Sequence, residues 1–417
     1  MRPSSPRLAV VALTLVAALA LVGCGSSESG SPSGPTFTAQ ISDAASIEQF
    51  YAPPAVTPQA PGLLIRAARI DTSITGARAW RVMFSSTATP TGMVTGGSTI
   101  ETGLVLIPTR ADGPHPVAVW GHPTTGITPA CAPSRQTRPE GNIVGAQALV
   151  DAGWIVAAPD YEGLGIDGLG PHPYLIGASL GRSMLDIVRA VDGLPDANRG
   201  TDLVAYGHSE GGQAALFAGQ MARSYAPELN LTAVAAMAPS GELDQIFRED
   251  HATVTGALLG GYLGGSWSKW FAASDPSAPI DQGFSTESLF DRASWRLADQ
   301  MAAACSVGEP SVLPLWGRVQ AAVDSGTFWR RNPGVDAPWS VKLAENSAGQ
   351  EPIPAPVLLT VGAADDIVSP AAVAATEARY RDNGTSVTMR RFPGGDHMSG
   401  VDLALAEVIE FLQNPTR

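Results

Sequence analysis

Lysine is nearly absent from this sequence, and positive charge is scarce as a whole. Lys269 and Lys342 are the only lysines, and acidic residues outnumber basic ones by 39 to 26, which gives a formal net charge of −13. A chain of that sign repels a phosphate backbone, and its arginines form no basic stripe. The composition therefore argues against nucleic acid as a partner.

Histidine is also infrequent, with 6 residues in a chain of 417. His122, His172 and His208 show neither an H-x-x-x-H spacing nor a carboxylate pattern typical of a metal site. We therefore expect no metal and no other cofactor. With 44% hydrophobic residues, 45 glycines and 34 prolines, the composition suits a large core with many turns.

The apolar run at the amino terminus, Leu8 to Val22, is too short for a comfortable membrane span. Arg2 and Arg7 precede it, as in a secretory signal. It ends in Leu21-Val22-Gly23-Cys24, which resembles a bacterial lipobox and predicts cleavage before Cys24 and attachment of lipid to its sulfur. An ordinary secretory signal with a coincidental cysteine is the alternative.

This amino terminus predicts a lipoprotein signal peptide at 1–23 and a flexible tether with an N-terminal lead-in at 24–58. Such a protein is lipid-anchored to the membrane on the extracytoplasmic face of the cell, or it is secreted.

The rest of the chain is organised around Gly207-His208-Ser209-Glu210-Gly211. This G-x-S-x-G sequence lies between a predicted strand, 203–206, and the start of a predicted helix at 213. On so tight a turn a serine projects its hydroxyl above the sheet, and a Cβ in place of either glycine would collide with neighbouring backbone. The pattern therefore predicts Ser209 as a nucleophile and the N–H of Glu210 as an oxyanion donor. A chance match to the pattern is the alternative.

Strand and helix patterns alternate on both sides of this turn. This alternation predicts an α/β fold with a mostly parallel, doubly wound sheet. The runs 80–85 and 99–107 suggest an antiparallel pair. Further strands are predicted at 117–120, 154–158, 232–237, 357–361 and 387–391, and helices at 142–152, 175–191, 370–381 and 401–412.

The alternation is interrupted at 242–350, between the two parts of the core at 59–241 and 351–417. We expect a mainly helical cap or lid there, whose aromatic side chains form its own core or the wall of a ligand site. Glycines at 256, 260 and 264 would let a helix pack closely or a flap bend. No strand precedes them and no Gly-Lys-Ser/Thr follows, so a phosphate loop is disfavoured. The insertion holds six of the 9 tryptophans, Trp267, Trp270, Trp295, Trp316, Trp329 and Trp339.

A serine nucleophile needs a base and an orienting acid, which on such a sheet follow in the order Ser, Asp or Glu, His. Only His251 and His397 follow Ser209, and His251 precedes every strand that could carry the acid. His397 is therefore the predicted base. The loop after the preceding strand offers Asp365 and Asp366, and Asp365 is favoured because an aliphatic residue follows it by three positions.

Several motifs support a more specific assignment as a set. They are Trp120-Gly-His-Pro-Thr-Thr-Gly126, Cys131-Ala-Pro-Ser134, Pro159-Asp-Tyr-Glu-Gly-Leu-Gly165, His172-Pro-Tyr174, the serine turn, and Gly362-Ala-Ala-Asp-Asp-Ile-Val368. From about Thr75 onward the chain resembles the secretory lipases of the fungal lipase A type and their actinobacterial relatives. The resemblance implies an α/β-hydrolase whose cap closes over an acyl chain.

The resemblance also implies that the loop after Trp120 completes the oxyanion hole. Relatives usually have glycine where Pro123 stands, and proline has no N–H to donate. Thr124 or Thr125, through backbone or hydroxyl, is therefore the expected second donor.

The sequence thus predicts a serine carboxylic ester hydrolase, a triacylglycerol lipase or carboxylesterase acting on medium or long acyl chains, without an obligate protein partner. A short-chain esterase and a serine peptidase on the same fold are alternatives, and a non-catalytic surface lipoprotein is the alternative from another class. If Cys24 carries lipid, Cys131 and Cys305 remain as an even pair in an oxidising compartment. A bond between them would join catalytic domain and cap, and resembles a bridge of the fungal lipases; two buried free thiols are the alternative.

Overall fold

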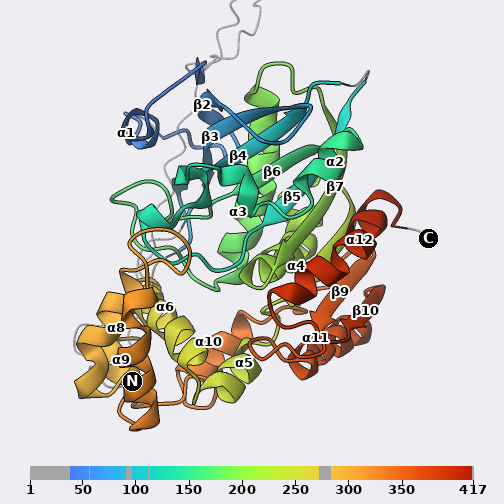
Figure 1. Cartoon of the computed structure of the whole chain (residues 1–417). Helices are drawn as coiled ribbons and strands as arrows, with labels where there is room; N and C mark the ends of the chain where they lie inside the picture. The colour runs from blue at the N-terminus through green and yellow to red at the C-terminus, as the bar shows by residue number, and fades with distance from the viewer. Residues whose placement is uncertain (1–37, 56, 91–95, 111–112, 272–282, 416–417) are drawn as a thin grey trace, which may run out of the picture. The chain divides into compact units, whose positions relative to one another are not determined.

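A ten-stranded sheet lies at the centre of the described structure, with the order β1-β2-β3-β4-β6-β5-β7-β8-β9-β10 (Figure 1). The computed structural model describes residues 38–55, 57–90, 96–110, 113–271 and 283–415, which belong to a compact unit that begins at Thr38. The strands are β1 (Gln40–Ser42), β2 (Leu64–Ile70), β3 (Ala77–Thr87), β4 (Ser98–Pro108), β5 (His115–Gly121), β6 (Ile155–Pro159), β7 (Arg199–His208), β8 (Asn230–Met237), β9 (Val357–Gly362) and β10 (Val387–Phe392).

The predicted antiparallel pair is present as β3 and β4, with Trp80 opposite Val105. β2 joins β3, and β6 joins β4, in the same antiparallel sense. From β6 through β5, β7, β8 and β9 to β10 every neighbouring pair is parallel. The prediction of a mostly parallel sheet is therefore confirmed.

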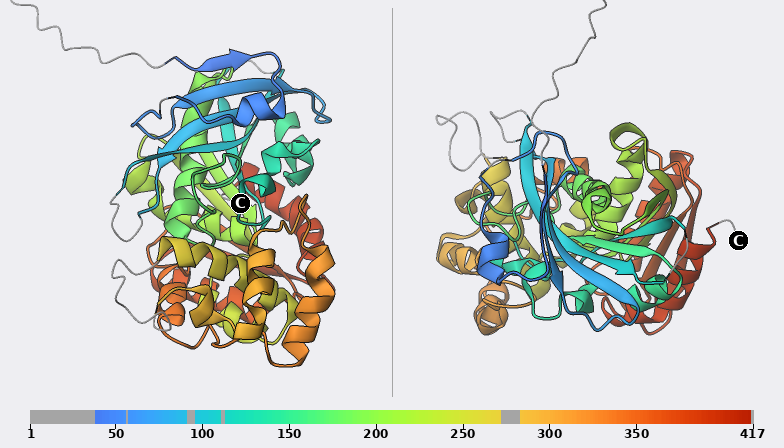
Figure 2. Two further views of the ribbon diagram at one scale, coloured as in Figure 1. Left: turned by 90° about the vertical axis from the view of Figure 1, so that its left-hand side faces the viewer. Right: turned by 90° about the horizontal axis from the view of Figure 1, so that it is seen from above.

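Helices cover both faces of the sheet, as a doubly wound arrangement requires (Figure 2). Side chains of β5 alternate between the faces, as the strand period of two dictates: Val117 and Val119 pack in one core cluster, Ala118 and Trp120 in the other. The first cluster includes residues of α3 (Gly177–Ala190), α4 (Glu210–Tyr225) and α11 (Pro370–Asp382). The second includes residues of α2 (Ala146–Asp151) and α12 (Ser399–Gln413).

The folded core begins earlier than the sequence predicted, so the lead-in at 24–58 needs correction. β1 pairs in parallel with β2, and the short helix α1 (Ile47–Tyr51) buries Phe50 and Tyr51. Ser46 and Gln49 form a capping box at the start of α1, a sequence signal that marks a helix start. These residues are folded because two aromatic side chains are buried there.

The predicted signal peptide at 1–23 and the lipid-attachment residue Cys24 lie outside the described residues. Within the ranges that the structure describes, no helix combines the length and the apolar character needed to cross a membrane.

The insertion between β8 and β9 is mainly helical, and its helices lie together at one end of the sheet. They have a separate hydrophobic cluster in which Trp267 and Trp339 are fully buried and stacked, with ring centroids 6.0 Å apart. The tryptophans here belong mostly to the core of the insertion, although Trp316 is 42% exposed. The helices are α5 (Leu243–Asp250), α6 (Val254–Trp270), α7 (Thr286–Leu289), α8 (Trp295–Ala302), α9 (Trp316–Asp324) and α10 (Trp339–Glu345).

The glycines of α6 serve close packing. A Cβ on Gly260 would lie 1.9 Å from the ring of Trp329, and one on Gly264 would lie 2.5 Å from Phe290. Of the two uses predicted for these glycines, the structure therefore has the packed helix. Short 3-10 helices complete the described elements: η1 (Pro129–Cys131), η2 (Pro133–Arg135), η3 (Pro139–Asn142), η4 (Val191–Gly193), η5 (Arg292–Ser294) and η6 (Leu313–Leu315).

Candidate active site

Ser209 occupies the turn between β7 and α4 in a conformation that L-residues rarely adopt, with φ 57° and ψ −118°. A Cβ on Gly207 would lie 2.1 Å from the carbonyl oxygen of Gly211, and one on Gly211 would lie 1.9 Å from that of Gly121. Both glycines are therefore sterically required, as the G-x-S-x-G pattern predicts. The Ser209 N–H donates to the carbonyl of Met237 at 2.9 Å, which fixes the strained turn against β8.

His397 and Asp365 lie together at the carboxyl ends of β10 and β9. The Nδ1 atom of His397 is 2.9 Å from Asp365 Oδ2 and 3.1 Å from Oδ1, and both side chains are buried. Asp365 Oδ1 also accepts the N–H groups of Ile367 (3.0 Å) and Val368 (2.8 Å). These contacts fix the carboxylate so that it can orient the imidazole, whereas Asp366 is exposed.

His208, which the sequence left without a role, connects the serine turn to the histidine loop. Its Nε2–H donates to the carbonyl of His397 at 3.0 Å, and the two imidazole rings are 4.6 Å apart. Burial, with a smaller effect of the neighbouring His397, lowers the pKa of His208 to about 3, so His208 is neutral. Within the described structure no hydrogen bond joins Ser209 Oγ to His397 Nε2; such contacts are often long before substrate binds.

Glu210 begins α4, which places its N–H at the positive end of the helix dipole. Across from it, the hydroxyl of Thr124 lies 3.1 Å from the hydroxyl of Tyr174. Thr125 is buried, and its hydroxyl has no hydrogen-bond partner among the residues described. Ser306 of the insertion binds this loop by donating to the carbonyls of Thr124 (2.6 Å) and Thr125 (2.9 Å).

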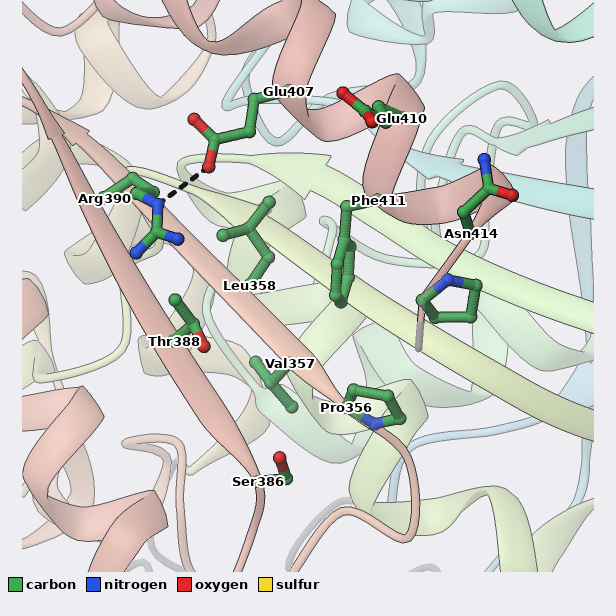
Figure 3. Close-up of a pocket in the computed structure, with 11 residues that line it drawn as sticks. Pro356, Val357, Leu358, Ser386, Thr388, Arg390, Glu407, Glu410, Phe411 and Asn414 are labelled. Carbon is green, nitrogen blue, oxygen red and sulfur yellow. Dashed lines mark hydrogen bonds and ion pairs between the residues drawn. The ribbon is translucent and has the colours of Figure 1, made fainter. Parts of the chain in front are cut away.

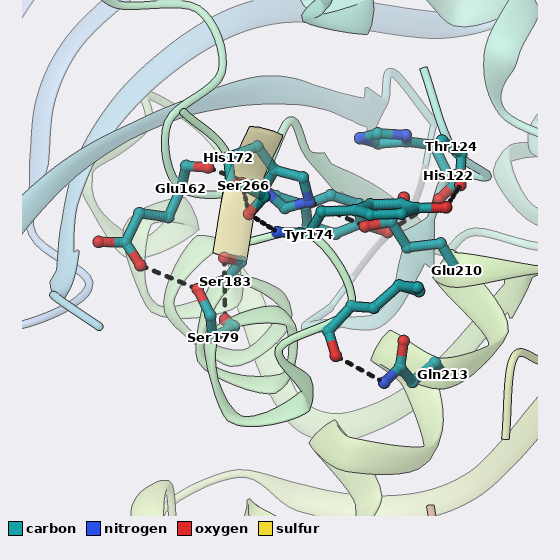
Figure 4. A network of polar contacts seen from close by, with 12 residues as sticks. His122, Thr124, Glu162, His172, Tyr174, Ser179, Ser183, Glu210, Gln213 and Ser266 are labelled. Carbon is teal, nitrogen blue, oxygen red and sulfur yellow. Dashed lines mark hydrogen bonds and ion pairs between the residues drawn. The ribbon is translucent and has the colours of Figure 1, made fainter. Parts of the chain in front are cut away.

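Glu210, whose N–H is one of the proposed oxyanion donors, also forms a buried pair with His172 through its side chain (Figure 4). His172 Nε2 is 2.8 Å from Glu210 Oε1, and both residues are almost fully buried. Sequence reasoning missed this pair because the two residues are 38 positions apart. The only local signal was Glu210 itself. It is a charged residue at the start of a buried helix, where an unpaired charge is costly.

Cys131 and Cys305 form a disulfide that joins η1 to the insertion. Both cysteines are fully buried, and Cys131 follows the oxyanion loop by a few residues. The insertion is therefore covalently attached beside the site. Among the residues that the structure describes, no cluster of three or more His, Cys, Asp or Glu side chains could hold a metal ion.

A cavity of about 480 Å³ lies next to the site, and the described residues that line it include neighbours of Ser209 and His397 but neither residue itself. Thr125 and His208 contribute to its wall, which is mixed in character: it has apolar side chains such as Trp120, Val307 and Met398, and polar or charged ones such as Asn142, Asp396 and Asp402. Met398 follows His397 directly and is 64% exposed, which leaves an apolar surface at the mouth. Part of an apolar substrate could occupy this space.

A second cavity, of about 590 Å³, lies between α12 and the amino-terminal ends of β9 and β10 (Figure 3). Pro356 and Ser386 mark those ends, whereas Asp365 and His397 follow the opposite ends of the same strands. We therefore assign this cavity no part in the chemistry.

Asp250, at the end of α5, is a buried carboxyl beside the acid loop. Burial, together with the nearby carboxylates Glu249, Asp366 and Asp365, raises its pKa to about 7. One of its oxygens is buried without a hydrogen-bond partner in the described structure. The side chain is therefore held protonated at mildly acidic pH.

Asp250→Asn is expected to stabilise the protein increasingly as pH rises. The pKa of about 7 in the folded protein exceeds the ordinary value of 3.8. The protonated carboxyl therefore makes its full contribution to the free energy of unfolding below about pH 4, and this contribution is lost as the pH rises to about 7. The difference in Tm between variant and parent should grow across that window and then level off. Asp244→Asn, on the exposed side of the same helix, is the control. A Tm difference for Asp250→Asn that is constant with pH would contradict the assignment.

The chain is similar to lipases in sequence. The family model described as Secretory lipase matches residues 129–270. A secreted triacylglycerol lipase of Malassezia globosa is 27% identical over 203 residues, 44% of this chain and 41% of the relative. A probable inactive lipase of Mycobacterium tuberculosis is 27% identical over 228 residues, 51% of this chain and 49% of the relative. The predicted resemblance is confirmed, and the chain spans less than half the length of these curated relatives.

Solved structures with the same fold superpose on most of the chain. The rice cell wall degrading esterase LipA from Xanthomonas oryzae superposes with a TM-score of 0.69 at 19% identity, covering 86% of this chain and 98% of that one. Candida antarctica lipase A gives 0.67 at 18% identity, covering 86% and 83%. These likenesses confirm the predicted α/β-hydrolase fold.

Proposed function

We propose that this protein is a serine carboxylic ester hydrolase of the lipase type. The observation that carries the proposal is the buried Asp365–His397 pair, which His208 links to the strained turn that presents Ser209. The sequence similarity to secretory lipases supports the same class of reaction.

In the proposed reaction Ser209 attacks the ester carbonyl while His397 accepts its proton. Asp365 holds the imidazole through Nδ1 and stabilises its cationic form. The Glu210 N–H and a donor from Thr124 or Thr125 stabilise the tetrahedral oxyanion. His397 then protonates the departing alcohol, and water repeats the sequence on the acyl-enzyme. No step requires a metal or a cofactor.

A medium or long acyl chain is the proposed acid part of the substrate. The apolar side chains Trp120, Val307 and Met398 in the wall of the 480 Å³ cavity support an apolar substrate part. The insertion at 242–350 acts in this proposal as a cap, because Ser306 binds the oxyanion loop and the disulfide attaches the insertion to η1, which follows that loop. Hydrolysis rates over p-nitrophenyl esters of increasing acyl length test this, and a maximum at acetate or butyrate would indicate a short-chain esterase instead.

A fluorophosphonate probe tests the reaction class. Such a probe phosphonylates only an activated serine, so we expect one adduct per chain, located by peptide mass spectrometry at Ser209 and absent from Ser209→Ala. Ser240→Ala, whose backbone is bound to Ser209 but whose side chain has no assigned role, is the control. An unlabelled parent protein would favour a non-catalytic surface protein, the second candidate, since one relative is named a probable inactive lipase.

The proposed location is outside the cytoplasm, with lipid on Cys24 or as a secreted protein. The similarity to secretory lipases supports an extracytoplasmic location. The intact mass of the amino-terminal peptide of the mature protein decides between a lipidated Cys24 and an unmodified end.

A further inference from the structure

The segment His172–Tyr174 lies between the two proposed halves of the oxyanion hole (Figure 4). His172 Nε2 is 2.8 Å from the carboxylate of Glu210, whose own N–H is the first proposed donor. Two residues further, the Tyr174 hydroxyl is 3.1 Å from the hydroxyl of Thr124, on the loop that supplies the second. One short segment therefore contacts both sides of the site.

The segment is fixed on its core side. His172 Nδ1 lies 2.8 Å from the carbonyl of Glu162, and the His172 N–H donates to the carbonyl of Ile127 at 2.9 Å. A Cβ on Gly163, which has φ +81°, would lie 2.6 Å from His172 N, so the two backbones touch directly. The imidazole cannot move without losing contacts to buried polar groups, which is costly.

The cap helix α6 holds the same segment from the other side. Ser266 Oγ donates to the His172 carbonyl at 2.6 Å and accepts the Tyr174 N–H at 3.0 Å. Trp267 Nε1–H donates to the Tyr174 carbonyl at 2.8 Å. Ser266 and Trp267 are fully buried, so the backbone groups of 172–174 have no water to replace these partners.

We propose that residues 172–174 form a positioning bridge that sets the separation of the two oxyanion donors and makes it depend on the docking of α6. The proposal rests on the ester hydrolase function above. The bridge residues touch no reacting atom: His172 acts through Glu210 and Tyr174 acts through Thr124. Because preorganised donors stabilise the transition state more than the bound ester, loosening the bridge lowers kcat and leaves KM unchanged.

Tyr174→Phe is the first test, because it removes one hydroxyl and little volume. We expect kcat on a p-nitrophenyl ester to fall about tenfold with KM unchanged. The affinity for a trifluoromethyl ketone, which forms a tetrahedral oxyanion adduct with the serine, should fall by the same factor. Tyr380→Phe is the matched control: Tyr380 is also fully buried, and its hydroxyl donates to Gln220 at 2.9 Å, remote from the oxyanion loop.

Ser266→Ala tests the cap end of the bridge. It removes the two hydrogen bonds that Ser266 makes to 172–174 and leaves the one from Trp267. The variant should reproduce the loss of kcat and of ketone affinity without a change in KM. Ser268→Ala is its control, because among the described residues the Ser268 hydroxyl donates only to the carbonyl of Gly265 in the same helix, at 3.2 Å.

The outcomes separate the bridge from the proposed function. If the parent protein is not labelled by a fluorophosphonate, the ester hydrolase function fails first. If the parent is labelled but Tyr174→Phe and Ser266→Ala keep its kcat and ketone affinity within twofold, the bridge is overturned. Equal losses in Tyr380→Phe and Ser268→Ala would also overturn it, since general loosening would then explain the effect.

Discussion

Asp365→Asn is expected to lower kcat about 10⁴-fold with the protein still folded. The carboxylate of Asp365 accepts from His397 Nδ1 at 2.9 Å and from two backbone N–H groups. An amide at this position can donate to Nδ1, which favours the imidazole tautomer that protonates Nε2 and so removes the base. Steady-state kinetics on a soluble ester measures the loss.

Asp366→Asn is the matched control, since it makes the same chemical change one residue away. Asp366 is exposed and forms no hydrogen bond to His397 in the described structure. The kcat of the Asp366→Asn variant should therefore stay within a fewfold of the parent value. If Asp366→Asn lost activity and Asp365→Asn kept it, the acid would have to be reassigned by one residue.

Loss of the Cys131–Cys305 disulfide is expected to cause the largest change in stability. The bond closes a loop of 174 residues. In the chain-entropy model such a loop contributes up to about 5 kcal/mol to the free energy of unfolding, and residual structure in the unfolded chain reduces that figure. The double variant Cys131→Ser/Cys305→Ser should therefore show a much lower urea midpoint than the oxidised parent.

Reductant provides the internal control for this comparison. Dithiothreitol should lower the midpoint of the parent towards that of the double variant and leave the double variant unchanged. We also expect the cap to loosen first, because Cys305 lies in the insertion while Ser209 is held by β7 and α4. Two reactive thiols in denatured, unreduced protein would show that the bond does not form.

Much of the fold follows from local sequence. Alternation of strand and helix patterns predicted the mostly parallel sheet, because side-chain periods of two and of about 3.6 residues depend only on near neighbours. Gly207 marked the serine turn for a similar reason, because a Cβ there would lie 2.1 Å from Gly211, four residues along the chain. For Gly211 the clash of 1.9 Å is with Gly121 on the neighbouring strand, so its steric reason is visible only in the folded protein. The amino-terminal elements α1 and β1 were missed because they are short and carry weak periodicity.

Tertiary structure alone decided which buried polar groups pair. Nothing near Glu210 in the sequence identifies His172 as its partner, and nothing near His172 identifies Ser266, 94 residues away. Burial requires that such groups find partners, but the choice depends on which elements pack together. For that reason the sequence determined the chemical groups of the candidate site, whereas only the packing of α6, α4 and the oxyanion loop determined what holds them in place.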